Sequence, residues 1–278
     1  MVFAVLIAVL SGSIATSVSN PAQAAGGTWV ALGDSYSSGT GSPPYDADSK
    51  GFAPPASADG SNCQRASSAY APFIFSQVNH GRWNKLVFAA CRGAVTQDVI
   101  TRQASALTAD TTTVTLTIGG NDAGFASVMT KCLADITSGA PICNSGIDAA
   151  NKYIALTLPQ KLDDTYKVIR TFAPNATIYV LDYPQIYEET PSCGISLSLA
   201  IRKRLNTVAR NLQTVIEGAV QRAGSGFVPV DIDPPFTGRR ICSSDQAITD
   251  ATSFGDAYHP NFSGHTIIAS TLDEAFSR

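Results

Sequence analysis

Short runs of β-branched and apolar residues alternate with helical patterns along most of this chain. Five such runs are predicted as strands: 28–32, 86–90, 113–118, 177–181 and 227–230. Strands that alternate with helices favour a parallel sheet covered by helices on its faces. The sequence therefore predicts an α/β fold, a three-layer α/β/α sandwich around a parallel sheet.

Helical periodicity is clearest over 198–223. Apolar residues recur there at steps of three and four, at Leu205, Val208, Leu212, Val215 and Ala219. This spacing places a single apolar stripe on one face of a helix, which we expect to pack on the sheet. A second helix is predicted over 151–172, where Pro159 marks either a kink or the true start of the helix.

The last helix is predicted to begin at Pro260, because proline is tolerated in the first turn, where its missing N–H costs nothing. That start places His259 at the cap of the helix. His265 falls on the apolar face, among Phe262, Ala269, Leu272 and Phe276. We expect His265 to be a hydrogen-bonded core residue.

The first 24 residues are predicted as a signal peptide. Residues 2–10 are almost entirely apolar, 11–20 are small and polar, and Ala22-Gln23-Ala24 has the small-x-small form of a signal-peptidase site. The run is shorter than the roughly 20 apolar residues of a membrane span. No Lys or Arg lies near Met1, which leaves open a truncated start or an anchoring role. Cleavage after Ala24 leaves one exported domain, 25–278.

Composition narrows the class of partner. Charged residues make up 15% of the chain, the net charge is −3, and 44% of the residues are hydrophobic. A chain of this kind is globular and has no electrostatic footprint for nucleic acid. Six cysteines in an exported chain suggest disulfides, and spacing alone leaves every pairing open. Zinc is disfavoured, since no Cys-x-x-Cys spacing occurs.

Four short blocks carry the residue types of acyl-transfer chemistry. They are Gly33-Asp34-Ser35, Cys91-Arg92-Gly93-Ala94, Gly119-Gly120-Asn121-Asp122 and Asp256-Ala257-Tyr258-His259. The first three follow predicted strands, and ligands of parallel α/β sheets bind outside the carboxyl ends of the strands. One site can therefore gather a serine nucleophile and a histidine base. Each block alone is also ordinary turn chemistry.

Taken in this order, the four blocks resemble the SGNH (GDSL-type) hydrolase family, in its secreted actinomycete-type lipase, phospholipase and esterase branch. The resemblance implies a flavodoxin-like fold with five parallel strands. It implies that Ser35 attacks the ester, that His259 is the base, and that the oxyanion is held by the N–H groups of Ser35 and Gly93 and by the amide of Asn121. It also implies the disulfides Cys63–Cys91, Cys132–Cys143 and Cys193–Cys242.

The third member of the catalytic set is less certain within the family. Asp256 lies three residues before His259, and either its carboxylate or its main-chain carbonyl orients the imidazole; we expect the carboxylate. Asp34 and Asp122 are expected to bond local backbone and shape their turns. With an ordinary pKa near ~6.5, His259 would set the acidic limb of the pH profile.

The resulting functional prediction is a secreted hydrolase of carboxylic esters, active in lipid metabolism on lipid or phospholipid acyl esters through an acyl-enzyme on Ser35. Alternatives are a carbohydrate O-acetyl esterase of the same family and a non-catalytic exported binding protein. No cofactor and no metal are expected, and the predicted partners are a small-molecule or lipid ester and, transiently, a lipid surface. We expect a monomer. Tyr45 and Phe52, and the segment 131–147, are predicted as walls for the acyl group.

Overall fold

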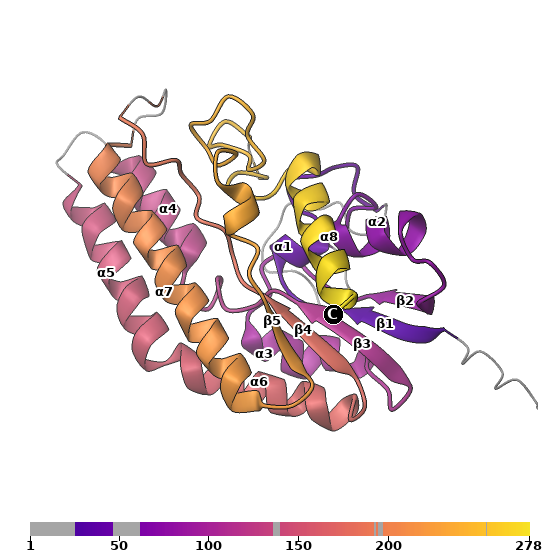
Figure 1. Ribbon diagram of the computed structural model, residues 1–278. Helices are drawn as coiled ribbons and strands as arrows, with labels where there is room; N and C mark the ends of the chain where they lie inside the picture. Colours follow the sequence, from indigo (N-terminus) through magenta and orange to yellow (C-terminus); the bar gives the residue numbers. More distant parts are fainter. Residues whose placement is uncertain (1–25, 47–61, 136–139, 192, 194–196, 254) are drawn as a thin grey trace, which may run out of the picture.

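A computed structural model describes residues 26–46, 62–135, 140–191, 193, 197–253 and 255–278 of this chain. At its centre is a sheet of five parallel strands (Figure 1). The strands are β1 (Gly27–Ala31), β2 (Trp83–Phe88), β3 (Thr111–Leu116), β4 (Thr177–Leu181) and β5 (Phe227–Val230). The predicted five-stranded parallel sheet is confirmed.

The strand order is β2-β1-β3-β4-β5, so the order reverses between β1 and β3. Val30 of β1 pairs with Val87 on one side and with Val114 on the other. In an open parallel sheet, the crevice for a ligand forms at this point of reversal, outside the carboxyl ends of the strands. The residues that follow β1 and β3 are therefore placed at the position where a site is expected.

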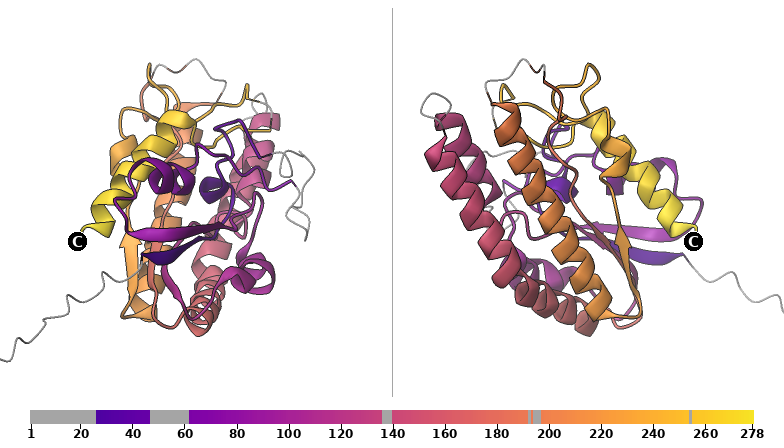
Figure 2. Two further views of the ribbon diagram at one scale, coloured as in Figure 1. Left: turned by 90° about the vertical axis from the view of Figure 1, so that its right-hand side faces the viewer. Right: turned by 60° about the vertical axis from the view of Figure 1, so that its left-hand side comes forward.

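Helices cover both faces of the sheet and give the predicted three layers (Figures 1 and 2). The helices α2 (Tyr70–Gln77) and α8 (Phe262–Phe276) pack together on one face, while α3 (Thr96–Asp98) and α6 (Leu158–Phe172) lie on the other. The helices α4 (Phe125–Ala134), α5 (Pro141–Leu156) and α7 (Leu199–Ala223) lie side by side beyond β5.

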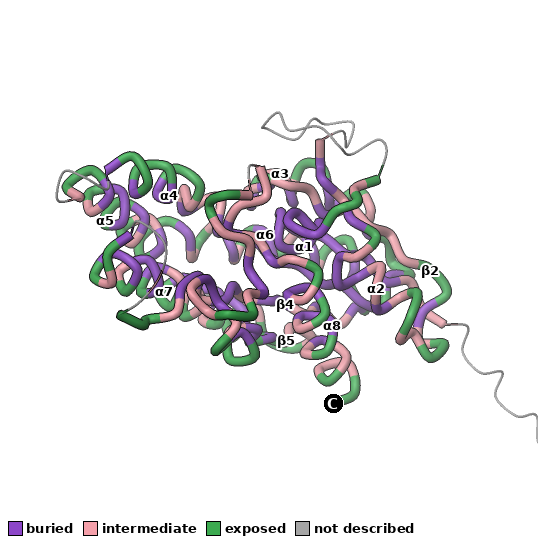
Figure 3. The backbone as a smooth tube through the Cα atoms, turned by 90° about the horizontal axis from the view of Figure 1, so that it is seen from above, coloured by how far each residue is buried: buried purple, intermediate pink, exposed green. Residues whose placement is uncertain are grey.

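Buried residues run through the middle of the molecule (Figure 3), and β1 and β3 contribute many of them. Trp29 of β1 is fully buried; its ring centroid lies 4.7 Å from that of Trp83, and its indole N–H donates to the Thr115 hydroxyl at 3.0 Å. Consecutive residues Trp29, Val30 and Ala31 of β1 are all buried because both faces of the sheet are covered, as is usual for parallel sheets.

Helix α7 confirms the prediction from periodicity. It spans Leu199–Ala223, and the side chain of Ser198 caps its first turn by accepting from the N–H of Ile201. Leu205, Val208 and Leu212 are buried along the predicted stripe. The predicted boundaries of the other two helices need correction.

The single helix predicted over 151–172 is two helices. α5 begins at Pro141 and ends at Leu156, and α6 begins at Leu158 with Pro159 in its first turn. Proline has no N–H and its ring clashes with the carbonyl four residues earlier, so the first helix cannot continue through it. The proline marks the start of the helix.

The last helix begins two residues later than predicted. α8 starts at Phe262, and Asn261 is its N-cap, accepting from the N–H of Gly264 at 3.1 Å. Pro260 instead forms an isolated β-bridge with Ile248. Because Asn is a strong N-cap residue, its side chain, rather than the fixed φ of Pro260, sets the helix start. His259 therefore lies in the preceding turn, outside the cap.

His265 of α8 is buried as predicted, at 1% exposure. Neither ring nitrogen has a hydrogen-bond partner among the described residues, which differs from the expected hydrogen bond. Burial lowers the pKa of His265 to about 3, which keeps the imidazole neutral.

Three disulfides pair the cysteines as the family resemblance implies: Cys63–Cys91, Cys132–Cys143 and Cys193–Cys242. The second joins α4 to α5. Along the described ranges, no helix is long and apolar enough to cross a membrane. Residues 1–25, with the predicted signal peptide, lie outside those ranges.

Candidate active site

Ser35 is the first residue of α1 (Ser35–Ser38), a single helical turn that follows β1. The chain turns sharply at Gly33, which has a φ of +121°. The Gln103 side chain holds this glycine from both sides: it accepts from the Gly33 N–H at 2.7 Å and donates to the Gly33 carbonyl at 2.8 Å. A Cβ at position 33 would lie 2.6 Å from the Thr117 carbonyl oxygen, so the turn requires glycine.

Asp34 caps this turn and ties it to the segments that follow β3 and β4. Its carboxylate accepts from the N–H of Tyr36 at 3.0 Å, from the Thr117 hydroxyl at 2.7 Å and from the Tyr183 hydroxyl. Burial raises the pKa of Asp34 to about 6, although these hydrogen bonds oppose the shift. The expected local contact is present, and two contacts with remote residues add to it.

His259 lies against Ser35 although 224 positions separate the two residues in sequence; its Nε2 is 2.8 Å from the Ser35 Oγ. The other ring nitrogen, Nδ1, lies 2.8 Å from the Ala257 carbonyl oxygen and 3.2 Å from that of Asp256. Carbonyl oxygens only accept hydrogen bonds, so the neutral ring carries its proton on Nδ1. Nε2 is left as the acceptor for the Ser35 hydroxyl.

The carboxylate of Asp256 does not point at the imidazole, which differs from our expectation. Its Oδ1 accepts from the Tyr45 hydroxyl at 2.7 Å. The turn before His259 folds back through Tyr258, whose φ is +66°, and this fold directs main-chain carbonyls at Nδ1. The main-chain alternative is the arrangement present in the structure.

Two further side chains hold this turn. The Thr249 hydroxyl donates to the Asp256 carbonyl oxygen, and it lies 3.2 Å from the His259 N–H, from which it accepts. The Tyr36 hydroxyl donates to the Tyr258 carbonyl at 2.8 Å, and the Tyr36 ring centroid lies 5.5 Å from that of His259. Thr249 and Tyr36 therefore hold the backbone of the turn from Asp256 to His259.

Burial lowers the pKa of His259 to about 4. The positive charge of Arg92 acts in the same direction, and the two carbonyl contacts at Nδ1 oppose it. A neutral imidazole with an unprotonated Nε2 is the form that can take a proton from a hydroxyl. The lowered pKa keeps His259 in this form at neutral and weakly acidic pH.

Asn121 follows β3 on the other side of the point of strand reversal. Its amide Nδ2 donates to the Ala94 carbonyl at 3.0 Å, which orients the amide and links it to the loop that carries Gly93. Gly93 has a φ of +78°, and no atom lies within 4 Å of a Cβ built there, so backbone conformation is what favours glycine.

Asp122 was expected to bond local backbone, but its carboxylate contacts a residue remote in sequence. It accepts from both the N–H and the hydroxyl of Thr96, at 2.9 and 2.6 Å. Thr96 begins α3, 26 positions away in sequence, so Asp122 joins the loop after β3 to a neighbouring helix.

A cavity of about 440 Å³ opens beside these groups, and Ser35, Asn121 and His259 contribute to its wall. The lining from α4, α5 and α7 is almost entirely apolar: Phe125, Ala126, Val128, Met129, Thr130, Leu133, Ala150, Ile154, Leu205, Val208, Ala209 and Leu212. Arg92 lines it as well, whereas its neighbour Gly93 does not.

Most of the described residues that were predicted as walls for the acyl group do not line this cavity. Tyr45 is not part of the cavity wall, and Phe52 lies outside the described residues. Among the described residues of 131–147, Leu133 alone contributes. Sequence reasoning placed no wall on α7, although its buried stripe provides one side of the cavity.

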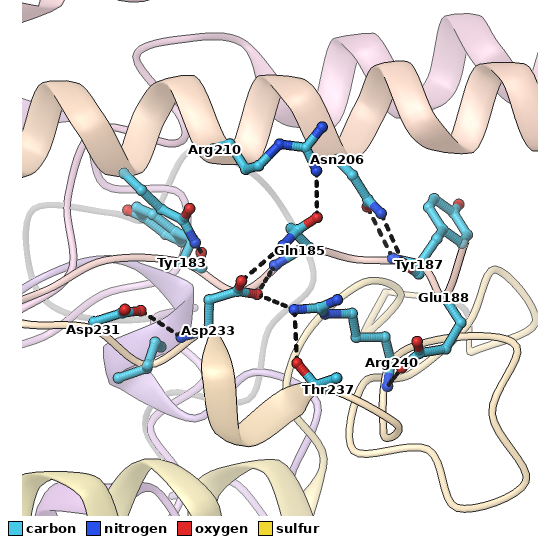
Figure 4. A network of polar contacts seen from close by, with 12 residues as sticks. Tyr183, Gln185, Tyr187, Glu188, Asn206, Arg210, Asp231, Asp233, Thr237 and Arg240 are labelled. Carbon is cyan, nitrogen blue, oxygen red and sulfur yellow. Dashed lines mark hydrogen bonds and ion pairs between the residues drawn. The ribbon is translucent and has the colours of Figure 1, made fainter. Parts of the chain in front are cut away.

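The segment that follows β4 forms another side, through Tyr183, Pro184 and Ile186. Figure 4 shows how polar contacts hold it: Gln185 bonds Asp233 through its N–H at 2.7 Å and its side-chain amide at 2.8 Å, and Arg240 pairs with the same carboxylate at 2.7 Å. Tyr183 was missed in the sequence, although it follows a predicted strand just as Ser35 and Asn121 do.

Comparison with known proteins identifies the family of this chain. The model of the GDSL-like lipase/acylhydrolase family matches residues 31–267, and the chain belongs to that family. The protein is therefore a carboxylic-ester hydrolase of the GDSL lipase/acylhydrolase type.

Individual relatives come from Streptomyces. Lipase 1 of Streptomyces coelicolor is 36% identical over 261 residues, which cover 93% of this chain and 89% of that protein. The crystal structure of a phospholipase A1 from Streptomyces albidoflavus NA297 superimposes with a TM-score of 0.79 at 36% identity, covering 90% of this chain and 99% of that one. An extracellular lipase from Streptomyces rimosus has the same coverage and TM-score at 34% identity.

Proposed function

We propose that the protein is a secreted hydrolase of long-chain lipid acyl esters that works through an acyl-enzyme on Ser35. The observation that carries this proposal is the hydrogen bond between Ser35 Oγ and His259 Nε2 at the edge of an apolar cavity. A nucleophile within hydrogen-bond distance of an oriented base is the arrangement that acyl transfer needs.

In the first half of the reaction, His259 takes the proton of the Ser35 hydroxyl as Oγ attacks the acyl carbon. The protonated imidazole then gives that proton to the leaving alcohol, and the acyl group stays on Ser35. In the second half, His259 takes a proton from water as the water attacks the acyl-enzyme, and returns it to Oγ as the acid departs.

The negative charge on the tetrahedral intermediate needs hydrogen-bond donors. We assign this role to the N–H groups of Ser35 and Gly93 and to the amide of Asn121. The Asn121 amide has two N–H bonds, one of which is directed at Ala94, so the other can serve the oxyanion. Neutral donors suit the site because they add no charge before the reaction.

The cavity favours a long acyl chain over acetate. Its volume of about 440 Å³ lies in the range of sites for sizeable ligands, and apolar side chains from three helices line it. A carbohydrate O-acetyl esterase has no physical need for such a cavity. Secretion is supported by the three disulfides, by the predicted leader and by the extracellular relative. A pure binding protein has no need of a paired serine and histidine.

The test is turnover of p-nitrophenyl esters from acetate to palmitate, with phosphatidylcholine and acetylated xylan alongside. We expect preference for the longer esters, nearly complete loss of turnover in Ser35→Ala, and a kcat lower by about 10²–10³ in Asn121→Ala. A serine-directed phosphonate should label the wild type at residue 35. Ser76→Ala, on the exposed face of α2, is the matched control. Preference for acetylated xylan, or labelling at another residue, would refute the assignment.

A further inference from the structure

One long-range hydrogen bond joins the loop after α1 to the turn before His259. The Tyr45 hydroxyl donates to Oδ1 of Asp256 at 2.7 Å, across 211 positions of sequence. The same hydroxyl accepts from the N–H of Gly41 at 3.0 Å, so it is held on both sides. A hydrogen bond to a carboxylate is stronger than one between neutral groups.

Tyr45 is also fixed to the helix that carries Ser35. Its backbone forms a β-bridge with Ala66, and the N–H of Ala66 donates to the carbonyl of Ser38 at 2.9 Å. Ser38 is the last residue of α1. Two backbone contacts therefore connect Tyr45 to α1, the helical turn that begins with Ser35.

On the other side of the bond, Asp256 is fixed to the base. Its carbonyl oxygen lies 3.2 Å from His259 Nδ1 and also accepts from the Thr249 hydroxyl. The loop that Tyr45 anchors packs directly on the histidine, since a Cβ on Gly41 would lie 2.9 Å from the His259 Cβ. The residue that Tyr45 holds is thus one whose backbone orients the imidazole.

We propose that Tyr45 is a positioning residue for His259 and acts through the carboxylate of Asp256. The proposal rests on the Ser35–His259 chemistry proposed above. Among the described residues no carboxylate contacts the imidazole, so the direction of the ring depends on the turn that supplies the carbonyls. That turn includes a non-glycine residue, Tyr258, in the left-handed region, a conformation that persists only where its surroundings hold it. The hydrogen bond from Tyr45 to Asp256 is one of the contacts that stabilise this turn.

The experiment compares kcat and KM for one p-nitrophenyl ester among the wild type, four variants and one control variant. Tyr45→Phe removes only the hydroxyl, and we expect kcat to fall about tenfold with KM unchanged, which corresponds to about 1.4 kcal/mol. Labelling by the phosphonate should slow in parallel, because it uses the same Ser35–His259 pair. Asp256→Ala should behave like Tyr45→Phe, and the double variant should be no worse than either, because all three lose the same bond.

Asp256→Asn supplies the decisive contrast. Asparagine keeps an oxygen that accepts from Tyr45, so we expect kcat to stay within about threefold of wild type. Direct action of the carboxylate on the imidazole instead requires a loss of several orders of magnitude, as in serine proteases with a catalytic aspartate. Tyr179→Phe, on β4 and away from the site, is the matched control for loss of a tyrosine hydroxyl.

Three results would overturn the proposal: a Tyr45→Phe variant with wild-type kcat, losses that multiply in the double variant, or a large loss in Asp256→Asn with none in Tyr45→Phe. A loss seen only in thermal stability would also reject it, since a purely structural bond leaves kcat unchanged. Failure of the proposed function is distinguishable, because the wild type itself would then neither hydrolyse the ester nor be labelled at Ser35.

Discussion

At the scale of single residues, His259 is a base whose ring nitrogens contact main-chain carbonyls and Ser35, with no carboxylate partner in the part of the chain that the structure describes. Two carbonyl oxygens contact its Nδ1, and the charge of Arg92 opposes the formation of an imidazolium. Burial and this charge together lower the pKa of His259 to about 4, well below the ordinary value. The histidine is therefore neutral, and able to accept a proton from Ser35, from neutral down to weakly acidic pH.

This shift moves the expected acidic limb of the pH profile away from ~6.5. Only neutral His259 can accept the Ser35 proton, so kcat/KM falls when the ring becomes protonated in the free enzyme. Because the pKa is lowered to about 4, we expect kcat/KM to stay level from neutral pH down to about 5 and to fall to half near pH 4. The measurement is kcat/KM for p-nitrophenyl butyrate across this range.

Enzyme held at each pH and assayed again at pH 7 controls for unfolding, since only a reversible loss reports on the base. An acidic limb near pH ~6.5, the ordinary pKa of histidine, would contradict the prediction. It would mean that water reaches the His259 ring in solution.

The site residues that sequence reasoning found are those with a local signal. Ser35 and Asn121 each follow a predicted strand, and parallel strands bring their ends together. Tyr45 and Thr249 had no such signal, because their roles depend on contacts with a turn that lies elsewhere in the chain. The direction of the Asp256 carboxylate likewise depends on how that turn folds, which spacing alone does not determine.

At the scale of elements, the strands and helix α7 were predictable, the start of α6 was left between two alternatives, and the start of α8 was predicted two residues too early. The central strands are buried on both faces, so continuous β-branched runs mark them in the sequence. The starts of α6 and α8 depend on competition between a proline and its neighbours, and a shift of two residues changes which side chain caps the helix. At α8, Asn261 caps the helix and its amide also donates to the Gln246 carbonyl at 2.7 Å.

The cap gives a prediction about stability. Asn261→Ala removes the acceptor for the Gly264 N–H, so we expect the free energy of unfolding to fall by about 1 kcal/mol. For a domain of this size the melting temperature should drop by roughly 2–4 °C. Thermal unfolding followed by circular dichroism measures it. Thr266→Ala is the control, because its hydroxyl bonds only a carbonyl within α8. Equal melting temperatures for the two variants would show that Pro260, not Asn261, sets the start of the helix.

At the scale of the whole molecule, the cavity is built from two parts of the fold. The segments after β1 and β3 and the turn before α8 supply Ser35, Asn121 and His259, and the helices beyond β5 supply the apolar wall (Figure 1). The lining residues are spread from Asp34 to His259, so no local pattern reveals the cavity. The sequence indicated the position of the polar site residues. It did not indicate the position of the apolar cavity, because the cavity depends on how α4, α5 and α7 pack together.

That packing leads to the prediction that most directly tests substrate class. Ala150, a small and buried residue of α5, lines the cavity, whereas its neighbour Ala149 is exposed on the outer side of the helix. Phenylalanine at position 150 fills space that we assign to the acyl chain. Each methylene excluded from an apolar site loses about 0.8 kcal/mol, or about fourfold in kcat/KM. Ala150→Phe should therefore lose activity steeply on palmitate and decanoate esters and little on acetate.

Ala149→Phe adds the same ring outside the cavity and should keep the wild-type preference. Because a large residue at a buried position can disturb folding, Ala209→Phe on α7 provides a second, half-buried test of the same wall. Retained activity on acetate shows in each case that Ser35 and His259 are still in place. If both cavity variants hydrolysed every chain length in the wild-type ratio, the acyl chain would have to lie outside this cavity. The apolar wall would then no longer support a long-chain substrate.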